Sequence, residues 1–124
     1  MKVIIAGSRS ITDYGLVIDA VIKSKFKITE VVSGTAKGVD TLGERYAMDE
    51  CIPIKRFKPN WTKYKKSAGF IRNEKMIQYV HPKGGLILVW DGMSKGSAHT
   101  LQYAREKKIK IYLYLLGGKH GHIN

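Results

Sequence analysis

The sequence predicts an α/β fold of the Rossmann-like class, a doubly wound sheet of about five parallel strands with helices on both faces. Two observations predict this class. Short apolar segments alternate along the chain with segments whose apolar residues recur at helical spacing. Several of the apolar segments end in turns of glycine and serine that lead directly into a helix. Strands separated by helices form βαβ units, and right-handed crossovers then produce a doubly wound sheet.

The expected strands and helices use most of the chain. Strands are predicted near residues 2–6, 28–33, 53–57, 86–90 and 110–115. Helices are predicted near residues 13–24, 38–50, 68–80 and 95–107. These elements belong to a single domain over residues 1–116, and the glycine-rich residues 117–124 are expected to form a flexible tail. The longest connection, residues 58–67, follows the third strand, where the chain crosses to the other half of the sheet.

The composition argues against several classes of protein. A chain of 124 residues is long enough for one domain with a single core. No apolar run approaches the ~20 residues that cross a bilayer, so we expect no membrane partner. Cys51 is the one cysteine, which argues against a disulfide framework and a cysteine-based metal site. We therefore expect a cytoplasmic protein with no metal and no required cofactor.

The chain is strongly basic, with 22 Lys and Arg against 10 Asp and Glu and a formal net charge of +12. Such a charge attracts polyanions. Its densest part is a basic patch with Lys55, Arg56, Lys58, Lys63, Lys65, Lys66 and Lys75. Trp61 lies among these residues, as expected where nucleic-acid bases stack beside a charged groove. The alternatives are a solvated lysine-rich surface and, for Trp61, an apolar anchor of the long connection.

Three turns of small residues are candidates for binding phosphate. They begin at Gly7, Ser33 and Asp91, each after an apolar segment. A turn that opens a helix leaves backbone N–H groups free at the positive end of the helix dipole. Because such turns meet at one edge of a parallel sheet, we predict a site for a phosphorylated ligand there. The alternative is that the glycines only let strand and helix pack closely.

The candidate ligand-binding residues come from these turns and from the helix near residues 68–80. They are Gly7, Ser8, Arg9, Ser33, Gly34, Thr35, Gly38, Asp40, Arg72, Asn73, Asp91, Gly92, Ser94, Gly96 and Ser97. Arg9 offers a bidentate fork for phosphate. Asp40 lies in the first turn of its helix, where complementing the dipole is the alternative. Asn73 shares the apolar face of its helix, so we expect it to be partly buried with a ligand as one candidate partner.

Four motifs resemble one known family. They are Ile4-Ile5-Ala6-Gly7-Ser8-Arg9, Ser33 to Asp40, Arg72-Asn73-Glu74-Lys75-Met76, and Trp90-Asp91-Gly92 with Gly96-Ser97. In this order they are similar to the YspA/YpsA-related branch of the SLOG superfamily, Rossmann-like domains that include DprA and the LOG enzymes. The resemblance covers nearly the whole chain. It implies a nucleotide or nucleotide-derived ligand, such as an NAD-like or ADP-ribose-like molecule, and a homodimer.

Two members of the superfamily suggest other functions. LOG enzymes are nucleoside-phosphate N-glycosidases, and the resemblance places their catalytic glutamate at Thr100. Threonine cannot supply the carboxylate that this reaction needs, so Asp40 or Asp91 would have to replace it. DprA, whose signature matches Ser33 to Asp40, binds single-stranded DNA, and the basic patch suits that partner. His99 is a candidate acid or base, with helix capping as the alternative. We favour ligand binding without turnover.

Overall fold

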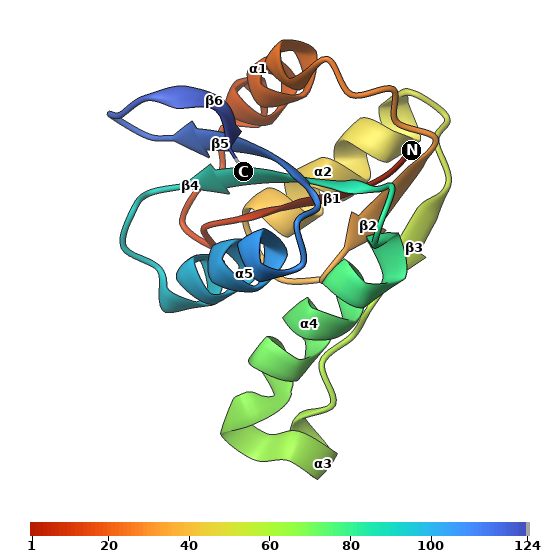
Figure 1. The fold of residues 1–124 in the computed structure, drawn as a ribbon, viewed down its shortest axis with the longest axis vertical. Helices are drawn as coiled ribbons and strands as arrows, with labels where there is room; N and C mark the ends of the chain where they lie inside the picture. Colours follow the sequence, from red (N-terminus) through yellow and green to blue (C-terminus); the bar gives the residue numbers. More distant parts are fainter. Residues whose placement is uncertain (124) are drawn as a thin grey trace.

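The computed structural model describes residues 1–123, and Asn124, the last residue of the expected tail, lies outside them. The chain forms one α/β domain around a single sheet (Figure 1). The strands are β1 (Lys2–Gly7), β2 (Glu30–Ser33), β3 (Ile54–Arg56), β4 (Gly85–Trp90), β5 (Lys110–Leu115) and β6 (His120–Ile123). The helices are α1 (Tyr14–Ser24), α2 (Val39–Asp49), α3 (Trp61–Tyr64), the 3₁₀ turn η1 (Lys65–Ser67), α4 (Ala68–Val80) and α5 (Lys95–Glu106).

The sheet has the strand order β3-β2-β1-β4-β5-β6. The pairs from β3 to β5 are parallel, and β6 is antiparallel to β5. Ile4 of β1 lies between Val32 of β2 and Leu86 of β4. The chain therefore winds in one direction from β1 to β3 and in the other from β4 onward. The strand order reverses between β1 and β4.

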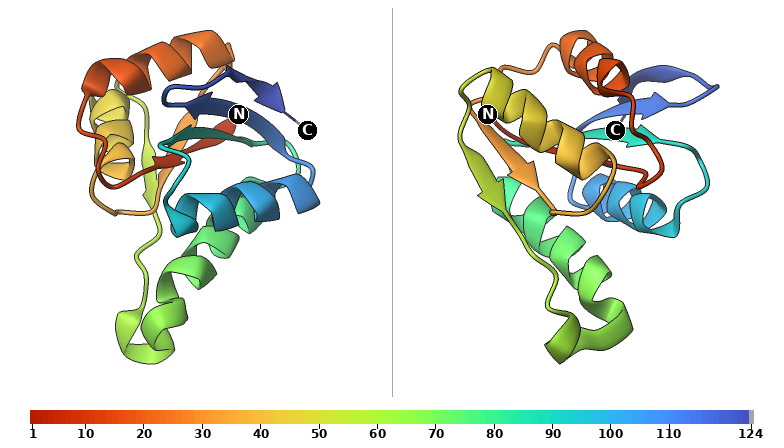
Figure 2. Two further views of the ribbon diagram at one scale, coloured as in Figure 1. Left: turned by 90° about the vertical axis from the view of Figure 1, so that its left-hand side faces the viewer. Right: turned by 180° about the vertical axis from the view of Figure 1, so that it is seen from behind.

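The alternation of side chains along the strands builds two cores, one on each face of the sheet. Val3 and Ile5 of β1 point into the core that α1 and α2 cover. Ile4 and Ala6 point into the core that α4 and α5 cover. Figure 2 shows the two helix layers on opposite sides of the strands. The four long helices bury their apolar faces in this way. Because α1, α2 and α5 each follow a parallel strand, their amino ends lie near the carboxyl edge of the sheet.

The structure confirms the predicted α/β Rossmann-like fold and adds a strand within the segment expected to form a tail. Residues 120–123 form β6, a sixth strand paired with β5. His120 stacks on Tyr114 of β5 at 3.7 Å between ring centroids, and a ring nitrogen of His120 lies 3.0 Å from the carbonyl oxygen of Leu115. These contacts hold the segment through tertiary structure, which its glycine-rich sequence does not indicate.

The long connection contains two short helical turns and projects from the body of the domain (Figures 1 and 2). We call residues 58–67 the arm. Asn60 is the N-cap of α3 in this arm, and its side chain accepts a hydrogen bond from the Lys63 amide at 3.0 Å. None of the residues in α3 or η1 is buried. Among residues 1–123, no helix combines the length and the apolar character that a bilayer span requires.

Candidate functional site

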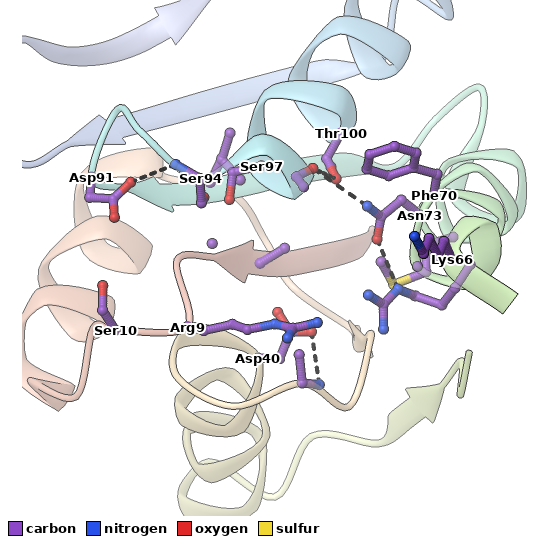
Figure 3. Close-up of a pocket in the computed structure, with 18 of the residues that line it drawn as sticks. Arg9, Ser10, Asp40, Lys66, Phe70, Asn73, Asp91, Ser94, Ser97 and Thr100 are labelled. Atoms are coloured by element: carbon purple, nitrogen blue, oxygen red, sulfur yellow. Dashed lines mark hydrogen bonds between the residues drawn. The ribbon is translucent and has the colours of Figure 1, made fainter. Parts of the chain in front are cut away.

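A pocket of about 440 Å³ opens at the carboxyl ends of β1 and β4 (Figure 3). Its walls come from the turns after these strands, the start of α2, the amino-terminal halves of α4 and α5, and the arm. The pocket lies where the strand order reverses, because the chain leaves β1 and β4 toward opposite sides of the sheet and the diverging turns leave a crevice. Its size is typical of a site for a small organic ligand.

The start of α5 is the open part of this pocket. The Asp91 carboxylate accepts hydrogen bonds from the amides of Met93 and Ser94 at 2.8 and 3.0 Å, and these bonds lower the pKa of Asp91. Within residues 1–123, the amides of the next three residues, 95–97, have no hydrogen-bond acceptor. The Ser94 hydroxyl is also buried without a partner in the described chain. Free donors and the positive end of the dipole thus face the pocket.

The turn before α2 is different, because its polar groups bond to the protein's own side chains. The Ser33 hydroxyl donates to Glu44 at 2.6 Å, and the Thr35 amide donates to the Ser33 hydroxyl at 3.1 Å. The other Glu44 oxygen accepts from Arg56 Nε at 2.9 Å. Thr35 holds a positive φ of 64° in this turn. The Ser33 hydroxyl therefore already donates to a carboxylate of the protein. From residues 33–40, Ala36 and Asp40 line the pocket.

A buried charge cluster lies between these two helix starts. Asp40 is 5% exposed and accepts a hydrogen bond from the Ala36 amide at 3.2 Å. Arg72 is 8% exposed and donates to the carbonyl oxygen of Gly34 and, at 2.8 Å, to Asn73. Burial raises the pKa of Asp40 to about 6, against the opposing effects of the Ala36 amide and Arg72. Burial also lowers the pKa of Arg72. The cluster gives the pocket a charged floor that responds to pH.

Asn73 ties this cluster to α5. Its side-chain nitrogen lies 3.5 Å from the carbonyl oxygen of Gly96, and the Thr100 hydroxyl donates to the same oxygen at 2.9 Å. The prediction that Asn73 is buried is confirmed, and the partners that the structure shows belong to the protein itself. Thr100 lines the pocket and carries no carboxylate.

The remaining wall is aromatic. Phe70, from the first turn of α4, and Trp61, from the arm, both line the pocket. Phe70 stacks on His99 of α5 with 4.4 Å between ring centroids and 24° between the ring planes. His99 Nε2 lies 3.1 Å from a Glu74 oxygen. His99, in the second turn of α5, therefore packs against Phe70. The alternative of helix capping is wrong, because His99 does not cap α5.

Comparison with known proteins identifies the family of this chain and a solved structure with a similar fold. The sequence model of the YspA, cpYpsA-related SLOG family matches residues 1–64. The chain belongs to this family. No curated protein sequence matches this SLOG domain. Its fold is similar to the X-ray structure of DNA processing protein A (DprA) from Streptococcus pneumoniae, with a TM-score of 0.68 and 20% identity. The similarity covers 90% of the SLOG domain and 49% of the DprA chain.

The SLOG domain brings nine of the fifteen predicted ligand-binding residues together in the pocket. The predicted residues that line the pocket are Gly7, Arg9, Asp40, Arg72, Asn73, Asp91, Ser94, Gly96 and Ser97, with Trp61 and Lys66 from the arm. Those that do not line it are Ser8, Ser33, Gly34, Thr35, Gly38 and Gly92, together with the rest of the basic patch, Lys55, Arg56, Lys58, Lys63, Lys65 and Lys75. The pocket thus draws on all three predicted turns, but unequally.

Two of the predicted glycines have a clear packing role. A Cβ at Gly7 would lie 1.8 Å from the carbonyl oxygen of Val89. A Cβ at Gly38 would lie 2.4 Å from the carbonyl oxygen of Ser8, and the φ of Gly38 is 74°. Ser8 also has a structural role, since its buried hydroxyl accepts from the Asp91 amide at 2.9 Å. For Gly7 and Gly38, the structure therefore supports the alternative of close packing.

Sequence reasoning missed several residues of the pocket. They are Ala6, Ser10, Ala36, Gly69, Phe70, Met76 and Leu88. Ser10 directly follows the predicted Arg9, and a wider window around that turn would have included it. Phe70 belongs to no motif, and its exposure of 43% is visible only in the structure. Among residues 1–123, no three His, Cys, Asp or Glu side chains gather as a metal site would require.

Proposed function

We propose that this SLOG domain binds a nucleotide or a nucleotide-derived molecule, such as ADP-ribose, in the pocket at the carboxyl edge of the sheet. The observation that carries the proposal is the start of α5, whose free amides face the pocket across from Arg9 (Figure 3). A helix start with free amides is a binding site for a phosphate group.

The charges around this helix start favour an anion. The first turn of α5 contains no acidic residue, and Lys95 is its first residue. Arg9 is exposed and lines the pocket, so its guanidinium can reach a phosphate held by the amides of residues 95–97. Arg72 and Lys66 add two further positive charges to the lining, against the carboxyl groups of Asp40 and Asp91. A ligand with a phosphate group suits this balance.

The carboxyl groups in the pocket support binding without turnover. The Asp91 carboxylate already accepts two backbone amides, and Asp40 is buried with the Ala36 amide and Arg72 beside it. Thr100 stands where the resemblance to LOG enzymes places their glutamate, and its hydroxyl bonds to Gly96. Each carboxyl group in the lining therefore already has a bonding role within the protein, which favours binding without turnover. The comparisons favour neither the N-glycosidase nor the single-strand-binding alternative.

Calorimetric titration of the purified protein with AMP, ADP-ribose and NAD tests the proposal. We expect Arg9→Ala to weaken binding of the best of these ligands at least tenfold, since it removes a charge-assisted contact. Lys58→Ala, a basic residue of the arm outside the pocket, is the matched control and should change affinity less than twofold. Incubation with AMP should release no free adenine.

Three results would contradict the proposal. One is the absence of binding for all three ligands at millimolar concentration. Another is equal binding by wild type and Arg9→Ala, which would place the phosphate elsewhere. Release of adenine would show turnover. Native mass spectrometry of the same preparation, followed by denaturing release, identifies any ligand that already fills the pocket.

A further inference from the structure

Part of the pocket is lined by aromatic and apolar side chains. Trp61, Phe70, Met76 and Leu88 all lie in this lining. In Figure 3, Phe70 and Lys66 lie on one side of the pocket, while Asp91 and Ser94 lie on the other. Met76 and Leu88 are buried, but Trp61 and Phe70 are 51% and 43% exposed. Large aromatic side chains with this exposure inside a pocket have surface available for a ligand.

Phe70 is held in a fixed orientation by its neighbours. His99 of α5 stacks on it. The ring of Tyr103 stacks in turn on His99, with 6.4 Å between ring centroids and 19° between the ring planes. Glu74 approaches His99 to 3.1 Å from α4, and Gln78 donates to the Tyr103 hydroxyl at 3.0 Å. A ring that is stacked and supported in this way keeps its position without a ligand, which lowers the entropic cost of binding on its exposed surface.

Trp61 approaches the same region from the arm. A Cβ at Gly69 would lie 3.7 Å from Trp61 Cη2 and 3.7 Å from Arg72 Nη2. The indole therefore reaches the first turn of α4, the turn that carries Phe70. No residue of α3 is buried, so the arm does not use Trp61 as an anchor in the core. Its half-exposed ring is instead a wall of the pocket.

We propose that Phe70 and Trp61 bind the planar base of the ligand, so that the pocket selects nucleotides over sugar phosphates of the same charge. This inference rests on the proposed function, which places the phosphate at the start of α5. The open helix start carries one end of the ligand, and the aromatic wall carries the other. Stacking on aromatic side chains tolerates different bases, because each base has a π-face. Arg72, beside Trp61, is placed to donate to the edge of the base.

The experiment compares ligands that differ only in the base. Wild type and variants are titrated calorimetrically with the four nucleoside 5′-monophosphates and with ribose 5-phosphate. We expect wild type to bind the best nucleotide at least tenfold more tightly than ribose 5-phosphate. Phe70→Leu and Trp61→Leu should each lower nucleotide affinity at least fivefold and leave ribose 5-phosphate binding within twofold. Tyr64→Leu is the matched control, an aromatic residue of α3 that does not line the pocket.

The outcomes separate the two proposals. If wild type binds ribose 5-phosphate as tightly as every nucleotide, or if Phe70→Leu and Trp61→Leu weaken both ligand classes equally, the aromatic wall does not read the base. In that case the phosphate site at α5 still stands. If wild type binds neither class, the proposed function fails and this inference fails with it. Because Phe70 and Trp61 are exposed, their variants should melt within a few degrees of wild type, which thermal unfolding checks.

Discussion

The turns that open α2 and α5 follow two parallel strands of the same sheet, β2 and β4, and both contain glycine and serine. At the turn before α2, Glu44 accepts hydrogen bonds from both Ser33 and Arg56. The Asp40 carboxyl group accepts one from the amide of Ala36 in the same turn. In the turn before α5, the amides of residues 95–97 have no acceptor within the described chain. The first turn of α2 thus contains an acidic group, whereas the first turn of α5 contains none and is open to an anionic ligand.

Two matched positions account for this difference. The second and sixth residues of α2 are Asp40 and Glu44, whereas the second and sixth residues of α5 are Gly96 and Thr100. Positions four apart share one face of a helix, so α2 presents two acidic groups near its amino end. These acidic groups complement the helix dipole there and disfavour a phosphate. Small residues in a turn are therefore a weak indicator of a phosphate site unless the helix that follows lacks such acids.

The largest expected effect comes from breaking the turn before α2. Gly38→Ala places a Cβ 2.4 Å from the carbonyl oxygen of Ser8, at a φ of 74°. We expect the free energy of unfolding to fall by about 3 kcal/mol or more, measured by urea unfolding. Gly117→Ala is the matched control, because Gly117 also has a positive φ, 70°, but has open space around it. A loss there of about 1 kcal/mol would reflect backbone conformation alone. Equal losses in the two variants would contradict the role given to close packing.

The next effect is on the pH dependence of stability, which should have opposite signs for Asp40 at the α2 start and Asp91 in the turn before α5. Because the pKa of Asp40 is raised from 3.8 to about 6, its contribution to stability is present below about pH 4 and is lost as the pH rises through 6. The free energy of unfolding of wild type relative to Asp40→Asn should therefore fall by on the order of 2–3 kcal/mol across this window.

Asp91 in the open turn should show the opposite sign. Its pKa is lowered by the amides of Met93 and Ser94, so its contribution is present above its unfolded pKa and is lost as the pH falls. Urea unfolding of wild type, Asp40→Asn and Asp91→Asn between pH 3 and 8 measures both slopes. A flat or rising difference for Asp40→Asn would show that attraction to Arg72 outweighs burial.

A smaller change should make the start of α5 resemble that of α2. Gly96→Asp gives α5 the acidic second residue that α2 has, and we expect it to weaken AMP binding at least tenfold relative to Gly96→Asn. The two variants have the same shape, so their difference reports the charge. The acid should also raise the free energy of unfolding relative to Gly96→Asn, by about 0.3–1 kcal/mol. Equal AMP affinities in the two variants would show that the phosphate does not bind at this helix start.

Much of the fold could be predicted because the signals are local. Apolar strands and helical spacing identify β1, β4 and α4, whose side chains are buried as their sequence patterns indicate. The strand β6 has no such pattern. It depends on the stacking of His120 on Tyr114 and on pairing with β5, contacts that a reading of local sequence does not reveal.

The site was predictable in part for the same reason. Arg9, Asp91 and Gly96 follow directly from the rule that turns after parallel strands meet at one edge. The bonding at the turn before α2 was not foreseeable, since Glu44 reaches Ser33 from the second turn of the helix and Arg56 joins from a different strand. Phe70 was missed because its role depends on the arm and on His99, which lie elsewhere in the sequence.

The sheet ends on both sides in short strands. On one side β3 has three residues, of which Lys55 and Arg56 are charged, and on the other side β6 has four, with Gly121 among them. An outer strand offers unpaired backbone groups to other chains, and brief or charged outer strands make that pairing unfavourable. The segment after residue 117 thus covers the six-residue strand β5, whose sequence is almost entirely apolar and aromatic. Pairing with β6 therefore keeps the edge of this apolar strand from being the outer edge of the sheet, where it would be exposed to strands of other chains.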